Sequence, residues 1–390
     1  MVKPFQFAKI PSIRFKNGGI ADLPGLTDIY GKKLVIVSGK SSFLLSLQAE
    51  KFFTGLKKTS ADWQIISIPG EPSPAMIDDA VKQIGRERID VVVSIGGGSV
   101  MDAGKAISAM LYKTDSVKEY LEFVGTKEHP GTKVPFIAVP TTSGTGSEAT
   151  KNAVISETGA QGFKRSLRHD NFVPDLALID PELTVNCPAH ITAASGMDCF
   201  TQLTEAFLSV KSNPYTDALA IEGLKAIKTS LSRVCKDGND LDARAGMSFA
   251  ALSSGICLAN AGLGAVHGFA SSIGARYDIP HGVICGTLMP VANELNVKVL
   301  RRNQNMMALE KYIYLGKLFL DKKEGNNDYF IDGFVDFLYR LSEELKLPGL
   351  RQAGVKEDNF EAICHDTDCK NNPVKLTSEE LMEILHKKYF

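Results

Sequence analysis

Short apolar segments alternate with amphipathic segments through the first half of the chain. The apolar runs, such as KLVIVS and DVVVSI, have the length and β-branched composition of buried strands. Strands that are apolar on both faces are typical of a parallel sheet covered by helices on each side. We therefore expect strands at residues 33–38, 64–68, 90–95, 134–139 and 175–179, with helices at 75–88 and 100–111.

The second half has a different pattern, because long helical periodicities replace strands from about Pro188 onward. Helices are expected at residues 195–210, 214–234, 242–259, 326–345 and 378–387. A change in composition near residues 180–190 marks a domain boundary. The pattern predicts a doubly wound, mainly parallel, Rossmann-like α/β domain at 1–185 and an all-α domain at 186–390. An active site is expected in the cleft between them.

Composition narrows the class of protein. The chain has 390 residues, 44% of them hydrophobic, and a formal net charge of -1, so bulk electrostatics do not favour a nucleic-acid partner. No stretch approaches the roughly 18 apolar residues of a membrane span, and the start lacks the apolar region of a signal peptide. The seven cysteines, mostly in apolar surroundings, predict reduced thiols in a cytoplasmic protein. A Cys/His/Asp group at 364–369 matches no usual zinc spacing.

A glycine-rich loop follows the strand expected at 90–95. The sequence GGGSVMDAGK carries three consecutive glycines directly before a predicted helix. Glycines let the backbone approach a ligand closely, and the helix N-terminus offers free N–H groups to a phosphate. A tight strand–helix turn is the competing interpretation. The loop therefore predicts a phosphate site, but nothing more specific.

A second polar loop, PTTSGTGSE at 140–148, follows the next expected strand. Its hydroxyl side chains and glycines suit hydrogen bonds to a ribose, a carboxamide or a phosphate. Taken alone, this segment could also be an ordinary surface turn. Because open α/β sheets bind ligands at the carboxyl ends of their strands, two such loops at neighbouring strand ends favour a nucleotide site.

A possible metal site is spread over two distant segments. Asp198 and Gln202 are four residues apart in a predicted helix and so share one face. His267 and His281 lie in a later apolar, glycine-rich segment. A carboxylate, two imidazoles and an amide oxygen could hold Zn²⁺ or Fe²⁺. A single histidine in such surroundings is more often part of the core, and the sequence alone does not bring the two segments together.

The motifs together resemble those of the iron-containing (group III) alcohol dehydrogenase family. They include GGGSVMDAGK, PTTSGTGSE, GMDCFTQLTEA and GLGAVHGFASSIGARYDIPHG, and the resemblance extends over nearly the whole chain. The resemblance implies a dehydroquinate synthase-like architecture and an NAD(P)-linked, metal-dependent dehydrogenase in which Asp198, His267 and His281 are catalytic metal ligands. It also implies that the dinucleotide is bound by Gly97, Gly98, Ser99, Asp102, Thr141, Thr142, Thr145 and Lys164.

Two departures from the family pattern concern the metal site. The family usually has a histidine four residues after the ligand aspartate, where this chain has Gln202. It usually has another four residues after the first ligand histidine, near the substrate, where this chain has Ser271. An amide oxygen is a weaker ligand than an imidazole, so the choice between iron, zinc and an empty site is left open.

A third departure concerns the dinucleotide. Many NAD-using members end the first strand with an aspartate that binds the ribose hydroxyls, whereas this chain continues with Gly39, Lys40 and Ser41. A small neutral residue admits a 2′-phosphate, and Lys40 could pair with it. The cofactor is therefore expected to be NAD or NADP, with NADP preferred.

The expected reaction is reversible hydride transfer between the nicotinamide and an alcohol or aldehyde, with the metal as a Lewis acid. If Arg168 and Arg276 face the cleft, they favour an anionic substrate such as a 3-deoxy-octulosonate sugar acid; otherwise they form ordinary ion pairs. Two alternatives stay open: a dehydroquinate-synthase-like lyase, and a catalytically silent dinucleotide-binding protein. The resemblance also implies a homodimer or larger homo-oligomer.

Overall fold

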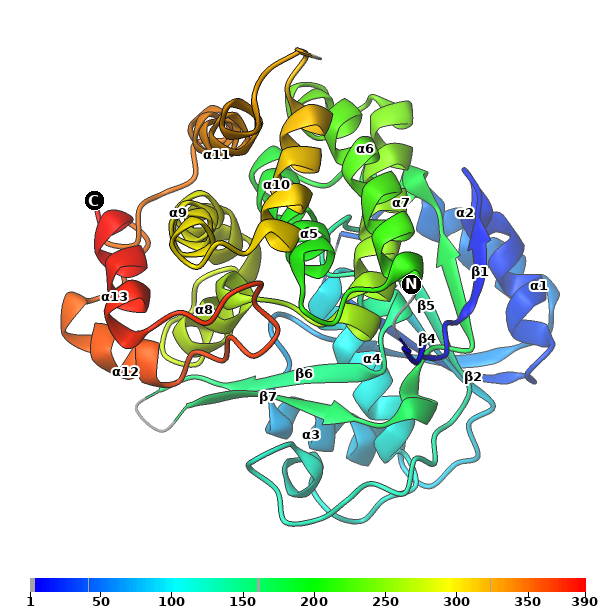
Figure 1. Cartoon of the computed structure of the whole chain (residues 1–390). Helices are drawn as coiled ribbons and strands as arrows, with labels where there is room; N and C mark the ends of the chain where they lie inside the picture. Colours follow the sequence, from blue (N-terminus) through cyan, green and yellow to red (C-terminus); the bar gives the residue numbers. More distant parts are fainter. Residues whose placement is uncertain (1–3, 41, 160–161, 323) are drawn as a thin grey trace.

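The computed structural model describes residues 4–40, 42–159, 162–322 and 324–390, in which a sheet-containing part is followed by a helical part (Figure 1). The main sheet has six strands in the order β1-β8-β5-β4-β2-β3, and every neighbouring pair is parallel. Its strands are β1 (Ser12–Phe15), β2 (Lys33–Ser38), β3 (Asp62–Ser67), β4 (Val91–Gly96), β5 (Phe136–Pro140) and β8 (Leu176–Ile179).

Helices cover both faces of this sheet, because its central strands are apolar on both sides. Along β2, Val35 and Val37 pack with α3 (Pro74–Ile84) and α4 (Gly98–Met110). The alternate residues Leu34 and Ile36 pack with α1 (Leu23–Asp28) and α2 (Leu47–Lys58). Side chains of a strand point alternately to its two faces, so a wholly apolar strand requires cover on both. The predicted doubly wound fold class is confirmed.

The five predicted strands all form, with ends that differ by at most two residues from those expected. The edge strand β1 was not expected, since its residues are all exposed. A second, two-stranded sheet was not expected either. It is the antiparallel hairpin of β6 (Asn152–Glu157) and β7 (Phe163–Arg168), which runs beneath the helical part in Figure 1. Because the sequence of β7, FKRSLR, contains three cationic residues, its pattern is typical of a surface loop rather than a strand.

The second half is helical throughout its described residues, as predicted. Its helices are α5 (Ala189–Leu208), α6 (Pro214–Lys236), α7 (Leu241–Ala261), α8 (Ala265–Gly274), α9 (His281–Arg302), α10 (Met306–Phe319), α11 (Asn327–Glu344), α12 (Phe360–His365) and α13 (Ser378–Lys387). The sequence pattern missed α8, α9, α10 and α12. α9 is buried over most of its length, so its sequence lacks the polar face that marks an amphipathic helix.

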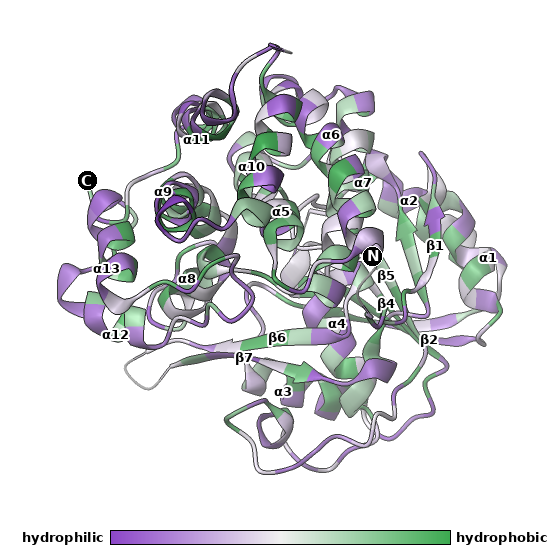
Figure 2. Cartoon of the chain, viewed as in Figure 1, coloured by the Kyte–Doolittle hydropathy of each residue, from purple (hydrophilic) through white to green (hydrophobic). Residues whose placement is uncertain are grey.

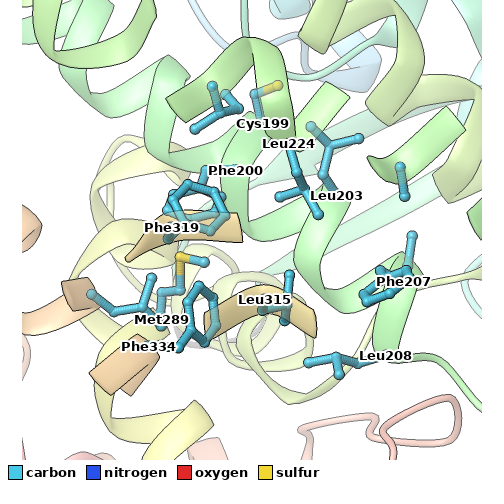
Figure 3. Packing of buried hydrophobic residues seen from close by; sticks show 14 of the residues in the cluster. Cys199, Phe200, Leu203, Phe207, Leu208, Leu224, Met289, Leu315, Phe319 and Phe334 are labelled. Carbon is cyan, nitrogen blue, oxygen red and sulfur yellow. The ribbon is translucent and has the colours of Figure 1, made fainter. Parts of the chain in front are cut away.

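The core of the helical part forms where α5 packs between α6, α9 and α10. Figure 3 shows Phe200 and Leu203 of α5 pointing toward Phe319 and Leu315 of α10. In Figure 2 hydrophobic positions, in green, and hydrophilic positions, in purple, are mixed along these helices. This packing makes α5 the rigid centre of the helical part, and its buried face carries the residues of interest below.

One helix, α9, is long and apolar enough to cross a membrane by composition alone, but most of that stretch is buried inside the protein. It is therefore the core helix of a folded domain. All seven cysteines lie in the described part of the chain as free thiols. Among the described residues, the 364–369 segment forms no metal-like cluster; its exposed His365 instead contacts Asp366.

We retain the domain division between residues 185 and 186 as a proposal. It lies between the short 3-10 helix at Pro181–Thr184 and the start of α5. The two parts meet where α7 contacts this 3-10 helix and the one at Ser147–Ala149 in the second polar loop.

Candidate active site

Three helices bring four potential metal ligands together. Asp198 is on α5, His267 on α8, and His281 and Cys285 on α9. One ligand atom from each lies within 4.8 Å of the others. Asp198 and Cys285 are buried, and the two histidines are mostly so. The expected convergence of a carboxylate with two imidazoles thus occurs in this fold, and a thiol joins them.

Local structure explains how each group reaches the cluster. α9 begins at His281, and Cys285 follows one turn later on the same face. α8 begins at Ala265, two residues before His267, and its first N–H groups need partners from outside the helix. Ala265 N donates to Asn372 Oδ1, and Val266 N donates to Glu205 Oε1. These contacts hold the first turn of α8 against α5.

Glu205 also orients the imidazole of His267. His267 Nδ1 lies 2.7 Å from Glu205 Oε2 and donates to this carboxylate. Its other nitrogen, Nε2, lies 3.2 Å from Asp198 Oδ1 and 3.7 Å from Cys285 Sγ. A histidine whose second nitrogen donates to a carboxylate is the usual arrangement at metal sites, because it fixes the ring and makes the ligand nitrogen more basic.

The cluster has strongly perturbed acid–base properties. Burial alone would raise the pKa of Asp198, but contacts with His267 and the charges of both imidazoles lower it overall. Burial lowers the pKa of His281 to about 4, so this ring is neutral and able to bind a metal at neutral pH. Burial would also lower the pKa of His267, but Cys285, Asp198 and Glu205 outweigh it and raise the value.

These residues fit a divalent metal ion. The set offers one carboxylate, two imidazoles and a thiol, which is a donor combination typical of zinc or iron. Among the described residues, His281 Nδ1 is buried without a hydrogen-bond partner, and the opposite ring nitrogen, Nε2, is the one directed at the cluster. His281 Nε2 lies 3.9 Å from Asp198 Oδ1.

Gln202 and Ser271 replace the two family histidines in different surroundings. Gln202 is buried beside Asp198, and its Nε2 donates to Asp198 Oδ1 over 3.2 Å. Its Oε1 accepts from Ser254 Oγ over 3.0 Å. Ser271 is exposed one turn after His267 on α8. The hypotheses that Gln202 binds the metal and that Ser271 contacts the substrate stay predictions.

Strand register places the two expected cofactor loops side by side. Gly96 of β4 is paired with Pro140 of β5, and Thr141 N donates to Gly96 O. A side chain at Gly98 would meet Thr145 at 2.8 Å, so glycine is needed there for the loops to approach each other. The next helix, α4, starts at Gly98, so the free N–H groups of its first turn lie beside the space between these two loops. We call this space the glycine-lined crevice.

A buried lysine ties the two loops together. Lys105 on α4 donates from Nζ to Ser147 O, Thr150 Oγ1 and Asn152 O, at 2.9, 3.2 and 2.8 Å. Ser147 Oγ in turn donates to Asp102 Oδ1. Burial raises the pKa of Asp102 to about 6 and lowers that of Lys105 to about 8. Asp102 therefore stabilises the second polar loop through its contact with Ser147. Its expected contact with the cofactor stays a prediction.

Lys164 and Glu71 connect the glycine loop to the metal cluster. Lys164 Nζ lies 3.0 Å from Glu71 Oε2, and Ser99 Oγ donates to Glu71 Oε1 over 3.3 Å. Burial raises the pKa of Glu71, but the charges of Lys164 and His281 outweigh it and lower the value. A Cβ built at Gly274, the last residue of α8, would meet the Lys164 side chain at 3.4 Å, so this ion pair lies against the helix that carries His267.

The loop after β2 lies beside a cavity of about 150 Å³. Within the described part of the chain, a side chain at Gly39 would meet only Ser42 Oγ, at 3.8 Å, and Lys40 is exposed. Ser41, expected to bind the cofactor, lies outside the described residues. The cavity is lined by residues that include Ser42, Phe43, Gly97, Thr141, Thr142 and Ile191.

The two arginines considered for an anionic substrate are engaged in ion pairs instead. Arg168 on β7 lies 3.3 Å from Glu122. Arg276, just after α8, pairs with Asp366 at 2.6 Å and donates to Ser272 O. Since each guanidinium is already paired with a protein group, these residues lend no support to an anionic substrate.

Sequence reasoning missed three residues that shape the site. Glu205 follows Asp198 by seven residues, and this helical spacing could have placed it on the same face. Cys285 follows His281 by four, but it was interpreted as an ordinary buried thiol. Glu71 lies in the proline-rich PGEPSP loop, whose sequence carries no signal for a binding site.

Comparison with known proteins gives the same family over both parts of the chain. Residues 11–181 match the model "Iron-containing alcohol dehydrogenase", and residues 192–389 match "Fe-containing alcohol dehydrogenase family, C-terminal". Alcohol dehydrogenase 4 of Saccharomyces cerevisiae is 32% identical over 82% of this chain and 81% of the yeast protein. The NAD-dependent methanol dehydrogenase of Bacillus methanolicus is 30% identical over 92% and 93% of the two chains.

A solved structure shows the same architecture. The alcohol dehydrogenase from Oenococcus oeni superposes with a TM-score of 0.87 at 29% identity, covering 99% of this chain and all of the other.

Proposed function

Because the chain belongs to the iron-containing alcohol dehydrogenase family, we propose that it interconverts a small uncharged alcohol and its aldehyde beside the Asp198–His267–His281 cluster. It is an oxidoreductase, and its family implies a nicotinamide dinucleotide and a divalent metal, typically iron. The single observation that carries the proposal is the convergence of these three side chains on helices one of which, α8, packs against Lys164, whose partner Glu71 accepts from Ser99 of the glycine loop.

Each element of the site has a role in this proposal. Asp198, His267 and His281 hold the metal, which supplies Lewis-acid polarisation of the substrate oxygen. The turn at Gly97 and Gly98, with the start of α4, holds the pyrophosphate of the dinucleotide, whose nicotinamide supplies the hydride chemistry. The hydroxyl groups of Thr141, Thr142 and Thr145 in the second polar loop orient the rest of the cofactor.

The finer specificity rests on two further observations. Named relatives act on alcohols as small as methanol, and the arginines at 168 and 276 are already paired, so an uncharged substrate is favoured over an anionic one. The open space at Gly39 favours NADP, since no acidic side chain there opposes a 2′-phosphate. A homo-oligomer in the cytoplasm remains the expectation for the protein in the cell.

Reduced-nicotinamide absorbance with a panel of alcohols, hydroxy acids and sugar acids tests the proposal. We expect turnover of small alcohols that is lost on chelation and recovered with Fe²⁺ or Zn²⁺. Asp198→Ala should lose both bound metal and activity, because its carboxylate is the central ligand. Cofactor binding without turnover of any substrate would support the silent dinucleotide-binding protein. Product formation with no net change in nicotinamide would support the lyase.

A further inference from the structure

We propose that Cys285 Sγ, rather than the amide oxygen of Gln202, is the fourth protein ligand of the divalent metal. The inference rests on the metal site of the proposed function and names the group that completes it. It concerns a position where this chain departs from a set of three histidines and one aspartate.

The distances around His267 match the edges of a tetrahedral metal site. With metal–nitrogen and metal–oxygen bonds of about 2.1 Å and a metal–sulfur bond of about 2.3 Å, a tetrahedron has edges of about 3.4 Å between N and O and about 3.6 Å between N and S. His267 Nε2 lies 3.2 Å from Asp198 Oδ1 and 3.7 Å from Cys285 Sγ. His281 Nε2 lies 3.9 Å from Asp198 Oδ1, which is longer than the ideal N–O edge by about 0.5 Å.

Three potential ligand atoms face one another at this point. His267 uses its Nδ1 proton for Glu205, so Nε2 is the nitrogen left for a metal. It faces a carboxylate oxygen of Asp198 and the sulfur of Cys285 together. In the metal-free protein a proton on Nε2 can donate to Asp198. A metal ion would take the place of this proton and would also contact the sulfur, and the thiol proton would leave to solvent as the bond forms.

Gln202 is engaged elsewhere. Its amide nitrogen is directed at Asp198, because a carboxylate oxygen can only accept, so the amide oxygen points away from the cluster toward Ser254 Oγ. To bind the metal, the amide would have to turn over and place its oxygen against Asp198. We therefore assign Gln202 as a positioning residue that holds the carboxylate of Asp198.

Charge also favours the thiolate. The site is buried, and buried charges are stable only when they are paired. The carboxylate of Asp198 and a Cys285 thiolate would place two negative charges in direct contact with a divalent ion, whereas an amide ligand would leave Asp198 as its single directly bound anion, with Glu205 acting through the ring of His267. A thiolate is also a softer ligand than an amide or a third imidazole, so zinc and cobalt should bind better relative to hard cations such as Mg²⁺.

Cobalt substitution tests the assignment without any measurement of activity. The full-length protein is stripped with a chelator and loaded with Co²⁺, and its absorption spectrum is recorded. We expect the intense near-ultraviolet charge-transfer band of a thiolate–cobalt bond at one equivalent of metal. Absence of this band in the loaded wild-type protein overturns the proposal, whatever the variants do.

Variants identify the sulfur and the competing ligand. Cys285→Ser should abolish the band and weaken Zn²⁺ binding in chelator competition by at least about 100-fold, since even indirect partners change metal affinity 10–100-fold. Gln202→Ala should keep the band. Cys235→Ser is the matched control, because Cys235 is a half-buried thiol near the end of α6 and outside the cluster. A band that survives Cys285→Ser, or that disappears in Gln202→Ala, refutes the assignment.

Asp198→Ala separates this inference from the proposed function. If Asp198→Ala loses the metal while Cys285→Ser binds it as tightly as wild type, the metal site stands and only the cysteine assignment fails. If Asp198→Ala binds the metal as tightly as wild type, the site itself is wrong, and both proposals fail.

Discussion

The proposed preference for NADP depends on Gly39. This residue begins the loop directly after β2, and among the described residues a Cβ built there meets only Ser42 Oγ, at 3.8 Å. A carboxylate would therefore fit at this position without disturbing the fold. It would repel the 2′-phosphate of NADP and accept hydrogen bonds from the ribose of NAD.

Gly39→Asp should reverse the cofactor preference. We expect kcat/KM for NADP to fall about 10–100-fold, the equivalent of one charged hydrogen bond, with an equal or improved value for NAD. Steady-state kinetics with both cofactors measures the change. Gly39→Ala is the control, since it adds the Cβ without the charge and should leave the preference as it is. An unchanged NADP/NAD ratio in Gly39→Asp would show that the 2′-phosphate lies elsewhere.

Individual residues also show where sequence interpretation reached its limit. Asp198, His267 and His281 were recognised from motifs and do converge. Cys285 and Glu205 belong to the same cluster. The neighbouring sequence does not distinguish a thiol or carboxylate that serves as a ligand from one that is simply buried in an apolar helix. Arg168 and Arg276 were weighed as substrate contacts, and their partners Glu122 and Asp366 are distant in sequence.

At the scale of elements, α4 and the second polar loop act as one unit because of Lys105. Its ammonium is buried and donates to Ser147, Thr150 and Asn152, which are the end of that loop and the start of β6. The hydrogen bonds of Lys105 thus hold together the two loops that are proposed to bind the cofactor. Their spacing does not depend on the ligand.

Lys105→Met should loosen this unit. Removal of the ammonium leaves buried oxygens without a donor, and we expect a loss of stability on the order of 3 kcal/mol together with weaker dinucleotide binding. Urea unfolding and calorimetric titration with NADP measure the two effects. Lys118→Met is the matched control, because that lysine makes an exposed ion pair with Glu157 and should change stability by less than about 1 kcal/mol. Wild-type affinity and stability in Lys105→Met would contradict this account.

The hairpin of β6 and β7 is an element whose position matters more than its sequence suggests. It carries Lys164 to Glu71 and reaches the end of α8, where a side chain at Gly162 would meet Ala275 O. The alternation of polar and apolar residues in it is weak, since Leu167 is the one fully buried residue of β7 and charged residues occupy three of its six positions. A surface hairpin of this kind is therefore difficult to distinguish from a loop.

At the scale of the whole molecule, the metal cluster joins three helices that are separate along the chain. Asp198 and His267 are 69 residues apart, and His281 starts a further helix. A metal that binds only when α5, α8 and α9 are packed stabilises the folded state by mass action. In the proposed function, a metal bound at the cluster would therefore link these helices as well as serve the reaction.

Metal removal should lower the thermal stability of the protein. With free Zn²⁺ at about 100 times its Kd, the stabilisation is about 2.7 kcal/mol, which should appear as a metal-dependent rise in Tm. Differential scanning calorimetry of chelated and reloaded protein measures it. Asp198→Ala should show the same Tm with and without metal. A wild-type Tm that does not respond to metal would mean that the cluster does not hold a metal in the folded state.

Local sequence pattern determined five strands of the main sheet, the helical character of the second half, the two loops at the ends of β4 and β5, and the three principal ligand candidates. These features depend on neighbouring residues, because strand and helix periodicity and glycine-rich turns are short-range properties. Only the tertiary structure decided that α5, α8 and α9 meet at one point, that Cys285 completes their cluster, and that Arg168 and Arg276 are already paired. Such contacts depend on how whole helices pack, and no short stretch of sequence contains both partners.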